Sequence, residues 1–321
     1  MRVVVATHGH CFDGVGSAVV FTRLLRALDK SVDCRYRACG YGVGQLHVDE
    51  QVLSGEQNAI LDYRFFASDR LTWYFDHHRT AFRTPEDRAE FDARASAGRF
   101  FFDPAYASCT KLVADVARER FDLVDPMLEE LVRWADIVDA ARFDSAEHAI
   151  DRKNPVLRLV AVIEHQGDDS FLTKLVPELL GKPLLEVASS ADIERRYRPI
   201  GEKQERFVER VRAKAELRGR VVFVDLTDAV LETVGKFVTY ALYPREAYSV
   251  IVGRLKSGIK VSVGYNPWSN QPLDADISAI CARYGGGGHP VVGGISFETK
   301  DVERAREIAL RIADELSGGA A

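Results

Sequence analysis

Two imidazoles and a carboxylate fall within one short turn near the start of the chain, directly after an apolar run. They belong to His8, His10 and Asp13. Imidazole nitrogens and carboxylate oxygens bind divalent cations, and oxygen-rich sites with some histidine suit manganese, magnesium or ferrous iron. This turn therefore predicts part of a metal site, to be completed by acids from elsewhere in the chain.

A second group of acids and imidazoles follows two further apolar runs. Asp62 comes directly after one of them, and Asp76, His77 and His78 come in succession after the other. A lone aspartate after a strand usually caps a turn. Successive side chains of a strand point to opposite faces, however, so three consecutive polar residues after an aromatic strand cannot all face solvent on one side. Burying one of them without a partner would cost free energy. The Asp-His-His run therefore favours chemistry over structure.

Two more acids, Asp136 and Asp139, interrupt an otherwise apolar helical pattern over residues 127–141. An acid on such a helix is either a metal ligand or a surface and hydrogen-bonding residue. The pattern leaves both interpretations open.

A run of four glycines, residues 285–288, ends at His289. Glycines permit positive φ and close backbone approach. Successive backbone N–H groups can surround an anion, and the histidine can add a donor. The alternative is a flexible turn, but the adjacent histidine favours a phosphate or nucleotide contact.

Composition limits the classes of protein that fit this 321-residue chain. The net charge is -5, from 43 basic and 48 acidic residues, which argues against coating long nucleic acid but leaves a short nucleotide open. The five cysteines form no CxxC pair, so neither a disulfide framework nor a structural zinc site is indicated. With no secretory signal and no apolar run of about 20 residues, we expect a cytoplasmic protein without a membrane span.

The elements that must position the N-terminal groups alternate between strands and helices. The predicted strands are residues 2–7, 59–61, 71–75 and 100–102, and the predicted helices are 14–28, 109–120 and 127–141. This alternation predicts an α/β fold with a doubly wound, mostly parallel sheet. Ligands of such sheets bind beyond the carboxyl ends of the strands, where His8, Asp62 and Asp76 stand.

The C-terminal part reads as a smaller α/β domain. Residues 154–190 look helical, with a break at 181–183, and the highly charged residues 194–220 look like a connecting helix. Strand patterns then return before a final amphipathic helix at 301–316. We predict a metal-binding catalytic domain over residues 1–190, a helical linker over 191–217 and a substrate-binding domain over 218–321.

In this order, the motifs resemble those of the DHH phosphoesterase superfamily, in its DHH plus DHHA1 branch. Residues 76–78 match the motif that names the family, Asp62 matches its acid after an earlier strand, and Asp136 matches its fourth acid. Residues 286–289 match the GGGH run of DHHA1 domains, preceded by residues 276–280 as in the family. The resemblance covers nearly the whole chain.

The resemblance implies a manganese-dependent phosphohydrolase with two Mn2+ per chain, replaceable by Mg2+ or Fe2+, that activates water between two metals. The implied metal ligands are His8 and Asp13 for one ion, Asp62 bridging both, and His77 and Asp136 for the other, with Asp76 in or beside the coordination shell. The implied catalytic residues are Asp76, His77 and His78. The implied substrate contacts are His78 on the scissile phosphate, then Gly286, Gly287, Gly288, His289 and, more weakly, Arg254.

One departure from the family pattern concerns the first motif. Most members have two acids two residues apart, whereas Asp13 is followed at that spacing by Val15. A minority of relatives carry an H-x-x-C-x-D-G form, which residues 8–14 resemble. If Val15 stands where the second acid belongs, His10 is the candidate to replace it. We then expect the second metal site to be the weaker one.

The function that follows is hydrolysis of phosphodiester or phosphomonoester bonds in short oligonucleotides or small nucleotides. Short RNA (an oligoribonuclease activity), short DNA, 3′-phosphoadenosine phosphates and cyclic dinucleotides all fit. The alternatives are an exopolyphosphatase-like phosphohydrolase and a nucleotide-binding protein with impaired catalysis. Long duplex nucleic acid is not expected as a partner, and a homodimer is left open.

Overall fold

The computed structural model describes residues 1–40, 48–235 and 237–318. The chain divides into two compact units. The first contains residues 1–143 and 153–197, and the second contains 144–152 and the chain from 198 onward. The short segment 144–152, which the sequence analysis placed in the first domain, thus packs within the second unit.

A five-stranded parallel sheet organises the first unit, in the order β2-β1-β3-β4-β5. Its strands are β1 (Arg2–His8), β2 (Asp33–Cys39), β3 (Gln57–Leu61), β4 (Trp73–Asp76) and β5 (Phe100–Phe102). The predicted doubly wound, parallel α/β fold is confirmed. Strand β2 was not predicted, because it is an edge strand in which charged residues interrupt the apolar pattern.

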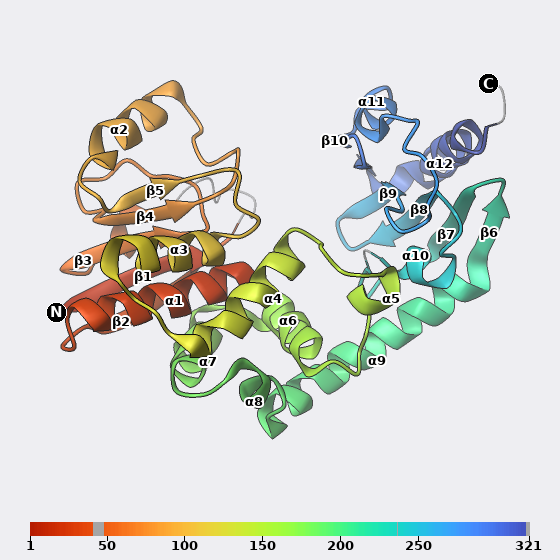
Figure 1. The fold of residues 1–321 in the computed structure, drawn as a ribbon. Helices are drawn as coiled ribbons and strands as arrows, with labels where there is room; N and C mark the ends of the chain where they lie inside the picture. The colour runs from red at the N-terminus through yellow and green to blue at the C-terminus, as the bar shows by residue number, and fades with distance from the viewer. Residues whose placement is uncertain (41–47, 236, 319–321) are drawn as a thin grey trace. The chain divides into compact units, whose positions relative to one another are not determined.

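Aromatic side chains of β4 alternate between the two faces of this sheet and anchor a helix on each. On one face Tyr74 packs with Phe91 of α2 (Pro85–Ala95). On the other face Trp73 and Phe75 contact Phe21 of α1 (Phe12–Leu28) edge-on. Figure 1 shows α2 and α1 on opposite sides of the strands. The period-2 alternation of a strand thus sets the layering of the unit.

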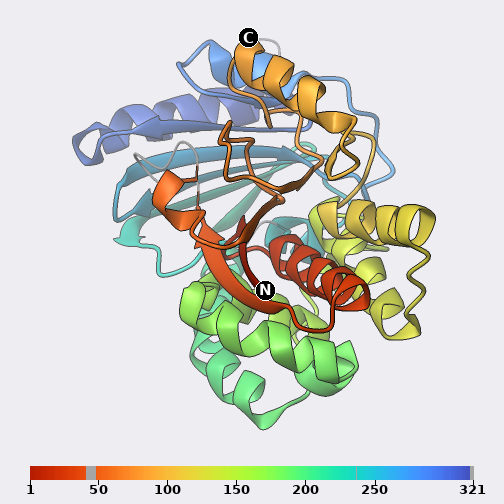
Figure 2. The ribbon, with the colours of Figure 1, turned by 90° about the vertical axis from the view of Figure 1, so that its left-hand side faces the viewer.

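The remaining helices of the first unit gather on the α1 side. Helices α3 (Cys109–Phe121) and α4 (Glu129–Asp139) pack on α1. Helices α6 (Pro155–Gln166), α7 (Asp169–Gly181) and α8 (Leu184–Ala188) follow, and Figure 2 shows them together beside β2 and α1. The predicted helix break at 181–183 separates α7 from α8. Short 3-10 helices lie at Glu50–Val52 and Pro126–Leu128.

The second unit contains a six-stranded sheet in the order β10-β11-β9-β8-β7-β6. Its strands are β6 (Ala215–Arg218), β7 (Val221–Val230), β8 (Tyr248–Leu255), β9 (Gly258–Tyr265), β10 (Gly287–His289) and β11 (Val292–Phe297). Only the β7–β8 pair is parallel among its described pairs.

Helices cover both faces of this second sheet. Its helices are α5 (Ala146–Ala149), α10 (Val238–Leu242), α11 (Ile277–Ala282) and α12 (Val302–Leu316), with a 3-10 turn at Thr299–Asp301. Helices α11 and α12 share one apolar cluster with the sheet. The long helix α9 (Ala191–Lys214), which joins the two units, packs its C-terminal half on the other face through Phe207 and Val211. None of the described helices is long and apolar enough to cross a membrane.

The contact between β1 and the start of α1 leaves no room for a side chain at Gly14. A Cβ built on Gly14 would lie 2.1 Å from the carbonyl oxygen of His8. The neighbouring Thr7 hydroxyl donates a hydrogen bond of 2.7 Å to the Gly14 carbonyl. The glycine therefore sets how closely the helix, with Asp13 in its first turn, approaches the end of the strand.

We predict that Gly14→Ala lowers the free energy of unfolding by about 1–3 kcal/mol, because backbone must shift to accommodate the methyl group. Denaturant unfolding measures this. The matched control is Gly181→Ala, since its Cβ meets no atom within 4 Å. That variant should be neutral or slightly stabilised. Equal stability of the two variants would contradict the close approach of α1 to β1.

Candidate metal centre

Three adjacent strands of the first unit end in the polar residues that the sequence singled out. His8 is the last residue of β1, Asp62 directly follows β3, and Asp76 is the last residue of β4. These strands are neighbours in the sheet. Because parallel strands end at the same edge, their polar side chains converge there. Asp13, in the first turn of α1, joins them.

Asp62 lies at the centre of this group in an unusual backbone conformation. Its φ is 54°, in the left-handed region that non-glycine residues seldom adopt. Its amide donates to the carbonyl of Phe75 at 2.9 Å. The side chain is 1% exposed, yet within the described part of the chain neither carboxylate oxygen has a hydrogen-bond partner. Burial opposes its charge, but the His77 and His8 imidazoles, 3.6 and 3.4 Å away, lower its pKa to about 2, so the carboxylate stays charged and could bind a cation.

The Nε2 atom of His77 faces three carboxylates at once. It lies 3.6 Å from Asp13, 3.6 Å from Asp62 and 3.4 Å from Asp139. These separations are too long for good hydrogen bonds. They are close to the roughly 3.0–3.5 Å that separates neighbouring ligand atoms each about 2.1 Å from one cation. Asp13, His77 and Asp139 thus form one candidate cation-binding group.

The other ring nitrogen of His77 fixes how the imidazole is presented. Its Nδ1 donates to the carbonyl oxygen of Tyr106 at 3.1 Å. A neutral ring must therefore carry its lone pair on Nε2, as a metal ligand requires. Burial lowers the pKa of His77, but Asp62 and Asp13 outweigh it and raise that pKa to about 10. Without a cation, a proton on Nε2 thus partly compensates the carboxylates.

Asp13 is held by the start of helix α3. Its two carboxylate oxygens accept the backbone amides of Cys109 at 2.7 Å and Thr110 at 2.8 Å. The positive end of the helix dipole favours the charged carboxylate. Burial nevertheless raises the pKa of Asp13 well above its usual value, and the negative charges of Asp62 and Asp139 raise it further. The site is therefore electrostatically unfavourable for several carboxylates at once.

The Asp76 carboxylate is held by hydrogen bonds from its own strand and loop. It is fully buried and accepts hydrogen bonds from the Tyr74 hydroxyl at 3.0 Å and from the amides of His77 and His78. The Nδ1 atom of His78 also donates to it, at 2.7 Å. Within the described residues, Asp76 belongs to none of the groups that could hold a metal ion. His78, with Nδ1 engaged, can offer only Nε2 to a ligand.

The two acids of α4 have different positions, and Asp136 is not the one that reaches the cluster. Asp136 accepts a hydrogen bond from the hydroxyl of Ser108, which is the N-cap of α3. Asp139, one helical turn later, lies beside His77. Burial raises the pKa of Asp139, and the charge of Asp62 raises it further. Asp139, and not Asp136, is thus the acid of α4 in a group that could hold a cation, while Asp136 anchors the helix that holds Asp13.

The first motif also differs from the expectation. Val15 is fully buried in the apolar core, so it does not occupy a ligand position. Instead the Cys11 thiol lies with His8 and Asp62 in a second group whose ligand atoms are all within 4.8 Å of one another. The His8 Nδ1 atom is 3.4 Å from Asp62. Position 11, not 15, is where the missing acid would stand.

His10 points elsewhere. Its φ is 56°, its Nδ1 donates to the carbonyl of Glu164 at 3.2 Å, and its amide donates to Gly167 at 3.1 Å. Both partners are at the C-terminal end of α6. His10 therefore joins the turn to α6 and does not replace the missing acid.

The glycine run of the second unit forms a tight turn and an edge strand. Gly285 and Gly288 have φ values of 80° and 153°, and a Cβ on Gly288 would lie 2.1 Å from a backbone oxygen. In contrast, a Cβ on Gly287 would meet no atom within 4 Å. Gly287 and the exposed His289 lie on β10, whose outer edge is unpaired in the described sheet. Arg254 is on β8 of the same sheet, and its buried Nε has no hydrogen-bond partner in the described part of the chain.

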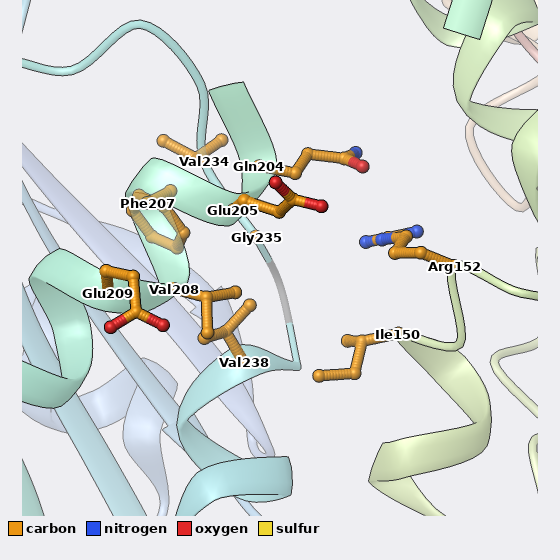
Figure 3. A pocket seen from close by; sticks show the side chains of 10 residues that line it. All are labelled: Ile150, Arg152, Gln204, Glu205, Phe207, Val208, Glu209, Val234, Gly235 and Val238. Atoms are coloured by element: carbon orange, nitrogen blue, oxygen red, sulfur yellow. The ribbon is translucent and has the colours of Figure 1, made fainter. Parts of the chain in front are cut away.

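A cavity of about 130 Å3 also occurs in the second unit, between the middle of α9, the segment after α5 and the start of α10. Figure 3 shows Ile150, Val208 and Val238 among its apolar walls. None of its lining residues belongs to a group that could hold a metal ion. Among the described residues, the groups that could hold a cation lie at the strand ends of the first unit.

Comparison with known proteins rests on structure. No family model matches the sequence, and no curated protein matches it. A pGpG-specific phosphodiesterase from Vibrio cholerae is 19% identical over 99% of both chains, with a TM-score of 0.69. A DHH-domain protein described as a member of a family of ribosomal proteins is 16% identical over 100% of this chain and 87% of that one, with a TM-score of 0.62. RecJ from Thermus thermophilus, solved with Mn2+, is 13% identical over 98% of this chain and 52% of that one, with a TM-score of 0.56.

The chain has the fold of the DHH superfamily. The sequence analysis identified this fold from the motifs around Asp62, Asp76 and His289. It did not single out Cys11, and it left Asp139 open between a metal ligand and a surface residue, whereas both belong to groups that could hold a cation. A spacing signal existed for both: Cys11 precedes Asp13 by two residues, as one acid precedes the other in the usual motif, and Asp139 follows Asp136 by nearly one helical turn.

The acids of α4 provide a paired test of the ligand set. In the metal-free protein, Asp139→Asn should leave the melting temperature unchanged or raise it, because the raised pKa means that the folded state disfavours the charged carboxylate. Mn2+ at 100-fold excess over its Kd stabilises a protein by about 2.7 kcal/mol. We predict that Asp139→Asn loses most of this gain, as measured by thermal unfolding with and without Mn2+.

The matched control is Asp136→Asn, which keeps an oxygen that can accept from Ser108. It should retain the stabilisation by Mn2+. Loss of the Mn2+ response in Asp136→Asn but not in Asp139→Asn would restore Asp136 as the ligand.

Proposed function

We propose that this protein is a metal-dependent phosphoesterase that hydrolyses phosphodiester or phosphomonoester bonds in short oligonucleotides or small nucleotides. The observation that carries the proposal is the Asp62 carboxylate. It is buried, and its two oxygens lack hydrogen-bond partners among the described residues. It belongs to two groups of potential ligands, one with His8 and Cys11 and one with His77 and His78. An aspartate with only a structural role would have donors around it.

The residues present fit two divalent cations that share Asp62. One would be held by Asp13, Asp62, His77 and Asp139, and the other by His8, Asp62 and Cys11. Manganese is the expected ion, with Mg2+ or Fe2+ as substitutes. Bound cations at such a site lower the pKa of water and neutralise the charge that develops on a phosphoryl group.

The charge of the cluster explains why cations would be needed even for binding. Asp13, Asp62 and Asp139 all lie within 3.6 Å of one imidazole nitrogen. A phosphate approaching them without cations would meet uncompensated negative charge. We therefore expect metal removal to weaken substrate binding as well as turnover.

The remaining residues of the first unit orient the reacting groups. Asp76 fixes the loop after β4 through the amides of His77 and His78, so we assign it a positioning role. His78, whose side chain is 31% exposed, keeps Nε2 for a phosphate oxygen. Its pKa is raised, because Asp76 and Asp62 outweigh the effect of burial. A protonated His78 would add a positive donor beside the substrate.

In the second unit, the turn before β10 has the features of a phosphate-binding or nucleotide-binding loop. Gly287 leaves the backbone accessible, and His289 adds an exposed donor next to it. Arg254 stands apart from this loop, because β9 and β11 lie between β8 and β10 in the sheet, so we do not include it in the loop's site. We propose that this loop binds a phosphate or the nucleotide part of a substrate.

A short substrate is favoured over a long strand. The pGpG-specific phosphodiesterase is similar to this chain over 99% of both lengths, which favours a substrate of dinucleotide size. The net charge of -5 provides no general basic surface for a long strand. Linear dinucleotides such as pGpG are therefore the first substrates to try, followed by short RNA, short DNA and 3′-phosphoadenosine phosphate.

The activity test is a hydrolysis assay with these substrates in Mn2+. We predict turnover of short substrates, loss of turnover and of substrate binding after chelation, and recovery of both when Mn2+ is returned. Asp62→Asn should remain inactive at any Mn2+ concentration. Hydrolysis that persists in chelator, or processive digestion of long single-stranded DNA in preference to dinucleotides, would refute the proposal.

The second unit is tested separately through Gly287 and His289. A methyl group at Gly287 meets no protein atom within 4 Å, so Gly287→Ala should fold normally. The methyl group should interfere only with a ligand that approaches the backbone. We predict that Gly287→Ala and His289→Ala each raise KM several-fold with a smaller effect on kcat. Gly181→Ala, equally free of contacts, is the control and should leave both constants unchanged. Unchanged kinetics in both loop variants would mean that the loop does not bind substrate.

A further inference from the structure

The helix-capping position of α1 carries an uncommon residue. Cys11 is the N-cap of this helix and makes no side-chain capping hydrogen bond. Serine, threonine, aspartate and asparagine stabilise such positions, whereas a thiol is a weak hydrogen-bonding group. A thiol at position 11 is therefore at best a weak cap for α1.

The neighbours of the Cys11 thiol are side chains that could bind a cation. His8 and Asp62 supply an imidazole nitrogen and a carboxylate oxygen, and all three ligand atoms lie within 4.8 Å of one another. Independently of the cysteine, Asp62 is buried with both oxygens lacking a described hydrogen-bond partner. One nitrogen, one oxygen and one sulfur thus converge on this side of Asp62.

We propose that Cys11 is a thiolate ligand and that the subsite formed by His8, Cys11 and Asp62 selects a thiophilic divalent cation, such as Zn2+, Fe2+ or Co2+, over Mg2+ and Mn2+. This inference rests on the proposed metal-dependent function and specifies one of its two sites. Thiolate ligands favour zinc and iron, while carboxylate and water ligands favour magnesium and manganese.

The other subsite has a different ligand set. Asp13, Asp139 and the shared Asp62 supply oxygen, and His77 supplies the only nitrogen among these ligands. Such a set suits Mn2+ or Mg2+. A thiolate and a carboxylate carry the same charge, but sulfur is a softer ligand than oxygen. The two subsites therefore prefer different metals. The centre would accordingly hold two different metals.

Cobalt(II) reports a bound thiolate directly. The protein is stripped with chelator and titrated with Co2+ while near-ultraviolet absorption is recorded, since a cobalt–thiolate bond gives a charge-transfer band there. We expect the band in the wild type, in Asp139→Asn and in Cys34→Ser, which removes a cysteine outside the site. Cys11→Ser should lose the band. Circular dichroism shows that each variant is folded.

Competition between metals provides the second measurement. Cys11→Ser should lower the affinity for Zn2+ at least about tenfold. Removing a residue that only supports a metal ligand already lowers metal affinity by about 10–100-fold, so removing a ligand should cost no less. Cys11→Asp should lower the ratio of Zn2+ to Mn2+ affinity and restore a site of oxygen and nitrogen ligands. Metal content after dialysis against an equal mixture of the two ions gives this ratio without any activity assay.

The outcomes separate this inference from the proposed function. A wild type that binds Co2+ without the charge-transfer band, or a band that survives in Cys11→Ser, would overturn the thiolate ligand while leaving a metal-dependent hydrolase intact. A protein that binds no divalent cation at all would overturn both. An unchanged ratio of Zn2+ to Mn2+ affinity in Cys11→Asp would overturn the selectivity.

Discussion

A buried concentration of negative charge at the carboxyl edge of a parallel sheet is the constraint on which the rest of this structure depends. Asp62 sits in that edge without a described hydrogen-bond partner, and Asp13 and Asp139 face it across the His77 imidazole. Burial raises the pKa values of Asp13 and Asp139, and the negative charge of Asp62 raises them further, whereas the nearby imidazoles keep Asp62 charged. The arrangement becomes favourable when cations lie between the ligands, which connects the architecture to phosphate chemistry.

Much of the first unit serves to hold these groups in place. The absence of a side chain at Gly14 lets α1 begin against the end of β1, which sets the position of Asp13. The amides that open α3 bind the Asp13 carboxylate, and Asp136 holds that end of α3 through Ser108. Asp136 therefore affects the site indirectly, through Ser108 and the start of α3. Asp136 thus lies near the cluster and yet acts by holding α3 in place.

The sequence predicted the sheet edge well and the helical contributions poorly, for identifiable reasons. Polar residues directly after apolar strands indicate a shared edge without any knowledge of packing. On α4, Asp136 and Asp139 are three residues apart and lie on the same side of a helix, so only the packing of α4 distinguishes them. In the first motif, a spacing of two residues from Asp13 fits both Cys11 and Val15. Helix α1 begins at Phe12, and this start buries Val15 and leaves Cys11 at the cap.

The central claim is that Asp62 bridges two cations, and anomalous diffraction from crystals grown with Mn2+ and Zn2+ tests it most directly. Data collected at the absorption edge of each metal would locate and identify the ions. The account predicts one ion on each side of Asp62, with manganese beside Asp13, His77 and Asp139 and zinc beside His8 and Cys11. Crystals grown in the presence of both metals that show no ion within coordination distance of Asp62 would contradict it.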